Sequence, residues 1–354
     1  KQINAAMLYA MKVSGGHTMK RNRLMTLFLG LSLVFLFAAG VSAAATAKGG
    51  SEAAPAGKIT LYTSVPQNIA DRLQSDYKAR FPGASLEVFR AGSSEVEAKL
   101  AAEKQAGSIQ ADLVWVAEPS TYEDFKAQKM LMKFTPSEAK VLPAEMKDKD
   151  GFYYAGRLIN MVVAFNVKAN PRPASWKDLL NPAYKGKIGF PTPASSGSAE
   201  AAVRTLADTE GFGWDYFKKF RANGGKQIKN NSAVQEQLST GELLAGGLLD
   251  FMMRDAKAKG SPVDYAWPSE GAVFIPSPIA VLQGAKNPEA AKAFVNYLLS
   301  KDGQVNMVKL GNFIPVRGDV DGPAGTPSLT KIKRLTTDWK QVREKRQDTK
   351  DQFE

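Results

Sequence analysis

The sequence predicts an α/β fold of two units, each holding a mostly parallel sheet flanked by helices. Between residues 58 and 130, three short apolar strands alternate with three amphipathic helices, and this order at short spacing is typical of a parallel sheet. A second series of apolar strands and helices begins near Leu158. The chain of 354 residues is long enough for two ordinary domains.

Periodicity justifies each element of the first unit. Ile69, Leu73 and Tyr77 recur at helical spacing and predict a helix with one apolar face. Serines followed by a glutamate at capping distance open the next helix. Strands are expected at residues 58–64, 84–90 and 112–116, and helices at residues 66–80, 93–106 and 119–130.

The second unit is less regular. Residues 175–190 predict a short helix, a loop and a strand, and residues 190–207 predict a junction between a strand and a helix. Residues 252–262 are expected to turn away from the strand before them, and residues 288–304 to form one amphipathic helix. Further strands are expected at residues 159–167, 243–251 and 272–282, and a helix at residues 232–242.

A last helix is expected at the end of the chain, after a linker rich in glycine and proline. Leu335, Trp339 and Val342 form its apolar stripe. Its basic residues are expected to form a solvated face. These residues are Lys340, Arg343, Lys345 and Arg346.

The N-terminal part of the chain has the pattern of an export signal. A basic start at Met19 is followed by an apolar core over residues 27–39 and by the small residues Val41-Ser42-Ala43. This pattern predicts a cleaved secretory signal peptide and a periplasmic location. The alternative is a membrane anchor, because residues 24–41 are long enough to consider one. Residues 1–43 are therefore set aside as upstream residues and signal, and residues 44–57 as a flexible tether.

Composition excludes several classes of chemistry. The chain has no cysteine, and its single histidine, His17, lies before the signal. Disulfides, thiolate sites, cysteine nucleophiles and most histidine schemes are thereby excluded from the mature chain. Five basic residues and no acid precede residue 44, so the formal charge of +12 falls to +7 beyond it. For an exported protein this charge predicts an anionic ligand or an anionic membrane surface, and nucleic acid is not expected, because no recognition motif is present.

The stretch FPTPASSGSAEAAVRTLA, from Phe190 to Ala207, places hydroxyl groups and a glycine where a strand ends and a helix starts. The first N–H groups of a helix have no intrahelical partner, and the helix dipole makes this end electropositive. A phosphate or carboxylate can therefore approach the backbone here. The alternative is that Ser195, Ser196 or Ser198 is simply an N-cap.

Polar or small residues also follow the strands of the first unit, at the edge where parallel sheets bind ligands. Asp250 follows a strand of the second unit and could meet a ligand amine, cap a helix or hydrogen-bond within the protein. Arg90 and Arg157 are candidate counter-charges, or solvated. The candidate ligand-binding residues are Ser64, Gly92, Ser93, Ser94, Glu118, Thr192, Ser195, Ser196, Gly197, Ser198 and Asp250. No catalytic residue is predicted.

Several stretches resemble bacterial extracytoplasmic solute-binding proteins of ABC importers, in the branch of ferric-iron, phosphonate and sugar-phosphate receptors. ITLYTS and ADLVWVAEPS resemble the start of such proteins. SWKDLLNPAYKGKIGFPTPASSGS, KGSPVDYAWPSEG and NPEAAKAFVNYLLSKDGQ resemble this branch, and the likeness runs from Lys58 to Arg317. The resemblance implies a type II periplasmic-binding-protein fold with two α/β lobes, two crossing strands and a ligand in the cleft between them.

From this resemblance, one lobe is expected at residues 58–157 and 277–328, and the other at residues 158–276 and 329–354. The resemblance implies a monomer without catalysis or cofactor that delivers a small organic anion to an inner-membrane permease. The anion would be a phosphonate, a phosphate ester or a carboxylate.

A ferric-iron receptor is the family alternative, but the paired tyrosines of iron-binding members are replaced here. Asp250-Phe251 and Ala164-Phe165 stand at the matching positions. Two more remote functions are compatible with the same scaffold, namely a sensor or docking protein and a secreted enzyme. The absence of histidine, cysteine and a nucleophile-elbow motif argues against the enzyme.

Overall fold

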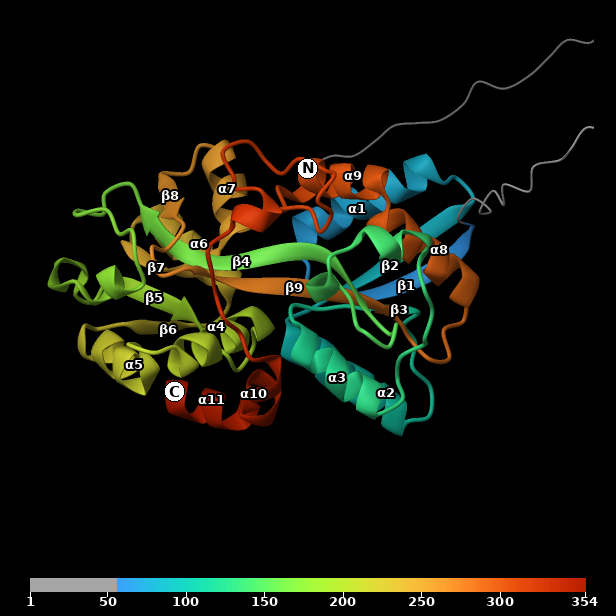
Figure 1. Cartoon of the computed structure of the whole chain (residues 1–354), viewed down its shortest axis with the longest axis horizontal. Coiled ribbons are helices and arrows are strands. Elements are labelled where there is room, and N and C mark those ends of the chain that lie inside the picture. Colours follow the sequence, from blue (N-terminus) through green and yellow to red (C-terminus); the bar gives the residue numbers. More distant parts are fainter. Residues whose placement is uncertain (1–55) are drawn as a thin grey trace, which may run out of the picture. The chain divides into compact units, whose positions relative to one another are not determined.

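Ten strands form one mixed sheet in residues 56–354, the part of the chain that this computed structural model describes (Figure 1). The expectations for residues 1–43 and for nearly all of the tether lie outside the described residues. The two longest strands, β4 (Tyr154–Asn166) and β9 (Ala272–Val281), lie side by side and antiparallel at the centre. The order of the eight main strands is β2-β1-β3-β9-β4-β7-β5-β6.

Parallel strands lie on either side of this central pair. On one side are β1 (Gly57–Thr63), β2 (Ala84–Arg90) and β3 (Leu113–Trp115). On the other side are β5 (Ile188–Pro191), β6 (Lys226–Ile228) and β7 (Ala245–Leu249). Two short strands extend the centre, since β8 (Val263–Ala266) pairs with β4 and β10 (Arg334–Leu335) pairs with β9.

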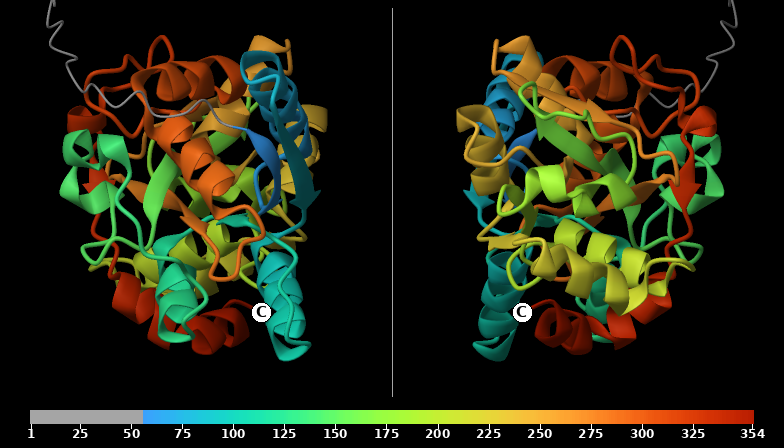
Figure 2. Two further views of the ribbon diagram at one scale, coloured as in Figure 1. Left: turned by 90° about the vertical axis from the view of Figure 1, so that its right-hand side faces the viewer. Right: turned by 90° about the vertical axis from the view of Figure 1, so that its left-hand side faces the viewer.

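Helices surround the strands, as the two end-on views show (Figure 2). The first group is α1 (Gln67–Arg80), α2 (Ser93–Gln105), α3 (Pro119–Ala127), α8 (Pro288–Leu299) and α9 (Lys301–Gly311). The second group is α4 (Gly197–Asp208), α5 (Gly213–Ala222), α6 (Asn231–Thr240) and α7 (Asp250–Ala258). We call β1–β3 with the first group the first lobe, and β5–β7 with the second group the second lobe.

The central pair is buried along its whole length. Every residue of β4 and of β9 is buried, including polar ones. Continuous burial of this kind is typical of strands covered on both faces. The β4–β9 ladder also changes register between Ala155 and Arg157. Such an irregularity bends the strand and redirects its side chains. It lies next to Arg157, which lines the candidate site described below.

Most predicted elements of the first unit are confirmed. The strand predicted over residues 84–90 is β2 to the residue, and the helix predicted from residue 93 is α2. The α/β class with flanking helices is likewise confirmed, but the parallel strands of the two units belong to one mixed sheet, joined by the antiparallel pair β4 and β9, and not to two separate sheets. The lobe boundaries stay a prediction.

Three predicted boundaries are wrong. The strand predicted over residues 243–251 ends at Leu249, because Asp250 begins α7, whose apolar side chains Phe251, Met252 and Met253 are buried. Residues 288–304 are not one helix, because the extended backbone of Ser300 ends α8 and its hydroxyl caps α9. Leu335 belongs to β10, and the last helix is divided into α10 (Trp339–Glu344) and α11 (Arg346–Phe353).

The C-terminal helices lie across both lobes (Figure 1). Helix α10 packs against α3 of the first lobe and against α4 of the second, and α11 packs against α4. The aromatic ring of Phe353 contacts the rings of Phe190 and Phe217 in the second lobe. The C-terminal segment is therefore anchored on the second lobe and reaches the first.

Candidate functional site

A small polar cavity of about 60 Å³ lies between the two lobes. The first lobe contributes Ser64, after β1, and Gly92 and Ser93, at the start of α2. The central strand β4 contributes Arg157 and Ile159. The second lobe contributes the starts of α4 and α6, through Ser195, Ser196, Ser198 and residues 230–232. Both lobes and the strand that joins them thus meet at this cavity.

Arg157 is the distinctive group of the cavity. It is 2% exposed, and its Nε donates to the Ser277 hydroxyl at 3.2 Å. Its Nη1 is buried without a hydrogen-bond partner, and no carboxylate of the described residues forms an ion pair with it. A buried charge without a partner is strongly unfavourable, so an anionic partner would stabilise this guanidinium.

The surroundings of Arg157 hold it in place without neutralising it. Its guanidinium lies over the rings of Trp115, Phe251 and Phe313, at 5.2 to 5.8 Å from their centres. Burial, with a further contribution from the positive charge of Arg90, lowers the pKa of Arg157 to about 9. The group therefore still carries its charge at neutral pH.

Three helix N-termini add to this positive character, since α2 and α6 begin at lining residues, and the residues on either side of Gly197, where α4 begins, also line the cavity. Gly92 precedes α2 and has no side chain to cap it. A second guanidinium, that of Arg90, lines the cavity with its Nε bonded to the Val65 carbonyl at 3.3 Å. Helix N-termini and guanidinium groups are the features that bind oxyanions in proteins.

The serines of the junction are partly engaged within the protein. The Ser196 hydroxyl accepts from Ala199 N at 3.3 Å, so Ser196 is the N-cap of α4. It also lies 3.0 Å from the Ser198 hydroxyl, and Asn231 Nδ2 donates to both. The Ser195 hydroxyl donates to the Lys229 carbonyl at 2.5 Å. Capping and ligand binding are therefore compatible here, because a hydroxyl can donate to one partner while it accepts from another.

Six of the eleven predicted site residues line the cavity, and five do not. The six are Ser64, Gly92, Ser93, Ser195, Ser196 and Ser198. The Asp250 carboxylate is fully buried and accepts from Asn160 N, Asn160 Nδ2 and Arg254 Nη2. Thr192 accepts from Ala194 N and Gln227 Nε2. The other residues that do not line the cavity are Ser94, Glu118 and Gly197.

Gly197 and Gly92 mark where the lobes touch. A Cβ built on Gly197 would lie 3.3 Å from the Glu118 side chain and from the Ser93 hydroxyl, both in the first lobe. A Cβ built on Gly92 would lie 2.9 Å from the Ser195 carbonyl oxygen of the second lobe. These glycines allow the two lobes to approach closely, and the structure shows them closed around the cavity.

Larger grooves of about 460, 500 and 520 Å³ lie elsewhere on the described part of the chain. None of them is lined by a side chain that has a buried, unsatisfied polar atom. The small cavity is lined by two such side chains, Arg157 and Asn231. The chemistry of the cavity, and not its size, therefore identifies it as the candidate site.

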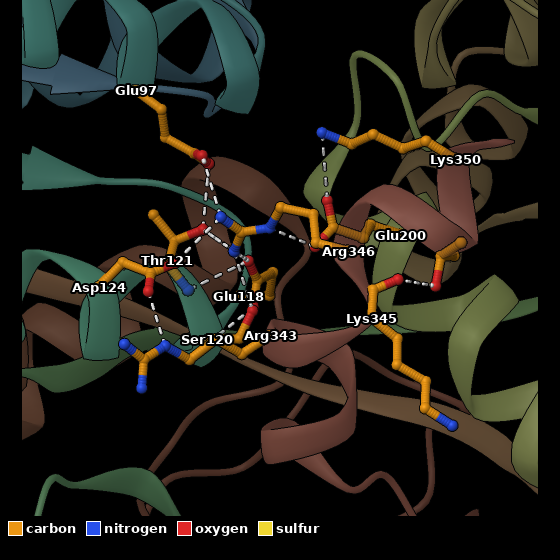
Figure 3. A network of polar contacts seen from close by, with 11 residues as sticks. Glu97, Glu118, Ser120, Thr121, Asp124, Glu200, Arg343, Lys345, Arg346 and Lys350 are labelled. Carbon is orange, nitrogen blue, oxygen red and sulfur yellow. Dashed lines mark hydrogen bonds and ion pairs between the residues drawn. The ribbon is translucent and has the colours of Figure 1, made fainter.

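A polar cluster around Arg346 adjoins the site and joins the lobes (Figure 3). Arg346, in the C-terminal segment, lies 3.6 Å from Glu97, 3.5 Å from Glu118 and 3.1 Å from Asp124, all of the first lobe. Its Nε bonds to Glu200 of the second lobe at 2.8 Å. The Glu118 carboxylate also caps α3, accepting from Ser120 N and Thr121 N.

Of the four basic residues expected on a solvated face, Lys340, Arg343 and Lys345 are exposed, and the cluster corrects the expectation for Arg346 alone. Arg343 pairs with Asp124 at 2.6 Å, and Lys350 lies 3.8 Å from Glu200. Burial and the negative charge of Glu118 raise the pKa of Glu200 to about 8, although Arg346 and Lys350 oppose the shift. Acidic groups therefore outnumber basic ones in the cluster. The sequence pattern of the C-terminal helix alone could not reveal these acidic partners, because they come from other elements.

Asn231 was not predicted from the sequence to belong to the site, and Arg157 was predicted to be either a counter-charge for the ligand or a solvated residue. Asn231 follows a second asparagine, Asn230, which caps α6. A strand followed by two asparagines and a helix is a usable signal for such an edge. Arg157 carries no local signal, since its partners Trp115, Phe251 and Phe313 come from distant parts of the chain.

Metal-binding clusters and membrane-spanning helices are both missing from residues 56–354. No group of three or more His, Cys, Asp or Glu side chains in this range is placed to hold a metal ion. No helix in the same range has both the length and the apolar character to cross a membrane.

Comparison with known proteins gives consistent similarities. The family model described as "Bacterial extracellular solute-binding protein" matches residues 73–333. The chain is 27% identical over 293 residues to the "Putative 2-aminoethylphosphonate-binding periplasmic protein" of Salmonella typhimurium, covering 77% of this chain and 82% of that one. It is 30% identical over 245 residues to the "Probable ABC transporter periplasmic-binding protein y4fP" of Sinorhizobium fredii, covering 64% and 65%.

A solved structure shows the same fold. The periplasmic binding protein AfuA from Actinobacillus pleuropneumoniae, determined with exogenous fructose-6-phosphate bound, superposes with a TM-score of 0.75 at 23% identity. The alignment covers 84% of this chain and 97% of that one.

Proposed function

The chain belongs to the bacterial extracellular solute-binding protein family, and from this premise we propose that its cavity captures a small phosphorus oxyanion for an ABC importer. Proteins of this family bind small ligands and deliver them to ABC permeases, and the family implies a periplasmic location. The proposed role is capture and delivery without catalysis.

The observation that carries the proposal is the unpaired, buried guanidinium of Arg157 beside a cavity of oxyanion size. One ordered water needs about 10–15 Å³ of such space, so about 60 Å³ holds a group of four or five atoms. A tetrahedral phosphate or phosphonate head fits this description. Two guanidinium groups and three helix N-termini favour a dianion over a monovalent carboxylate.

The donor set also bears on the ferric alternative. Ferric iron prefers hard anionic oxygens. The residues that line the cavity include no tyrosine, aspartate or glutamate. The cavity instead offers donors and positive charge, which favour an anion over a metal cation.

The test compares wild-type protein with Arg157→Met by calorimetric titration of inorganic phosphate, ethylphosphonate and propionate. We expect wild type to bind the phosphorus oxyanions more tightly than propionate. We expect Arg157→Met to weaken their binding about a hundred-fold, since it removes two hydrogen bonds to a charged acceptor. Melting without ligand should show no loss of stability, because an unpaired buried charge has been removed.

Arg204→Met is the matched control, because Arg204 is equally buried but pairs with Asp208 away from the cavity. It should lower the melting temperature and leave affinity unchanged. If wild type binds none of the three anions, or if Arg157→Met binds them as tightly as wild type does, the proposal is wrong.

A further inference from the structure

We infer that the site rejects ligands with a cationic amine, so that its substrates are phosphonates or phosphate esters with an uncharged organic part. This inference rests on the proposed function and narrows it to a substrate class. It also separates this chain from its relative in Salmonella typhimurium, whose name refers to 2-aminoethylphosphonate.

The wall of the cavity is positively charged. The charged side chains that line it are Arg90 and Arg157, and both are positive. The other polar lining groups are serine hydroxyls and asparagine amides, which carry no charge. A ligand ammonium in this small space would lie close to two guanidinium groups. Like charges repel most strongly where one of them is buried, as Arg157 is, whereas the charge of the exposed Arg90 is partly screened by solvent.

The carboxylates nearest to the cavity each have partners within the protein. Asp250 follows Leu249 of the lining, but its carboxylate is fully buried and holds Asn160 and Arg254. Glu118 lies close to Gly197 at the start of α4, but it caps α3 and pairs with Arg346.

One further carboxylate lies near the cavity without being part of its lining. Glu95 is exposed and accepts from Gly92 N at 3.2 Å, across the first turn of α2. Among the described residues, the lining of the cavity thus includes no acidic side chain that could receive an ammonium group.

The space in the cavity is also restricted. The cavity of about 60 Å³ holds the anionic head and little more. The substituent of a two-carbon phosphonate would stay close to the wall that surrounds the head. An amine at the end of such a substituent would lie near both guanidinium groups. Repulsion from the buried Arg157 would act on it with little screening, and repulsion from the exposed Arg90 with more.

Two probes of nearly equal size test this inference by calorimetric titration at pH 7. Ethylphosphonate and 2-aminoethylphosphonate differ in the terminal ammonium. We expect ethylphosphonate to bind at least ten-fold more tightly. Equal affinity, or tighter binding of 2-aminoethylphosphonate, would overturn the inference while leaving the proposed function intact. If neither phosphonate binds, the proposed function fails and the inference fails with it.

A charge substitution in the cavity provides the second arm. Asn231 is half-buried and donates to two serine hydroxyls, which can reverse direction and donate to a carboxylate instead. Asn231→Asp therefore places an acid in the wall without changing its shape. The affinity ratio of the two probes should shift at least ten-fold toward 2-aminoethylphosphonate. Asn231→Ala is the control and should leave the ratio unchanged; an unchanged ratio in Asn231→Asp would contradict the inference.

Discussion

Replacing Arg346 by methionine should destabilise the protein more than any surface ion pair can explain. The side chain lies between Glu97, Glu118, Asp124 and Glu200, at distances of 2.8 to 3.6 Å, and is 21% exposed. Removing one partner of a buried ion pair costs about 3–5 kcal/mol. Partial exposure, together with Lys350 and Arg343 nearby, places the expected loss near the lower end, about 3 kcal/mol.

The loss should also depend on pH, because the variant leaves a cluster of acids without its central cation. Burial raises the pKa of Glu200 to about 8 and also raises the pKa of Glu97, so Glu200 holds a proton at pH 5, which relieves the repulsion in the cluster. Above pH 8 Glu200 must ionise beside the other acids. Chemical unfolding at pH 5 and at pH 8 should therefore give a larger difference from wild type at the higher pH.

Arg343→Met is the matched control for this variant. Arg343 is 39% exposed and pairs with Asp124 at 2.6 Å. Exposed pairs of this kind contribute about 0–1 kcal/mol. If the two variants lose the same free energy of unfolding, or if the loss in Arg346→Met is equal at both pH values, then Arg346 does not join the lobes in the way described.

Two further predictions follow from the contact between the lobes. Gly92→Ala should weaken phosphonate binding at least ten-fold while leaving the melting temperature of the free protein unchanged. The reason is that the added Cβ would lie 2.9 Å from the Ser195 carbonyl only when the lobes are closed. Titration and melting curves measure both effects, and unchanged affinity would count against closure of the lobes at Gly92. Glu200→Gln should flatten the pH dependence of stability. The pKa of Glu200 is raised to about 8, so its protonated form stabilises the folded state fully below the ordinary value near 4.5, and this stabilisation is lost as pH rises through 8. Melting curves from pH 4.5 to 9 should fall less steeply for the variant, and identical slopes would refute this role.

The sequence was sufficient for those parts of the fold in which local pattern and tertiary structure agree. Residues 84–90 alternate and are bounded by turn residues, so β2 is predicted to the residue. α7 and the break between α8 and α9 could not be predicted in this way. The apolar residues at the start of α7 resemble an extension of β7, and an uninterrupted amphipathic pattern conceals the bend at Ser300.

The candidate site was predictable only where helix starts mark it. Ser93 and Ser195 stand at strand-to-helix junctions, and the structure brings them to one cavity. Arg157 lies within a buried strand, where pattern alone predicts an apolar residue. The Arg346 cluster joins residues as far apart as Glu118 and the C-terminal helix, and a basic stripe on that helix is indistinguishable in sequence from a solvated one. Contacts between residues far apart in the sequence determine the surroundings of both Arg157 and Arg346.

The position of Arg157 has a consequence for the order of events in binding. Arg157 belongs to β4, the strand shared by both lobes, whereas the serines and helix starts belong to one lobe or the other. An anion that enters an open cleft can meet this arginine before either lobe has moved. Electrostatic attraction mainly sets the rate of association, and the contacts completed on closure mainly set the rate of dissociation. Under the proposed function, arrival of the ligand would therefore depend on the strand that joins the lobes and the lifetime of the complex on the lobes, so that the two rates could change independently through different residues.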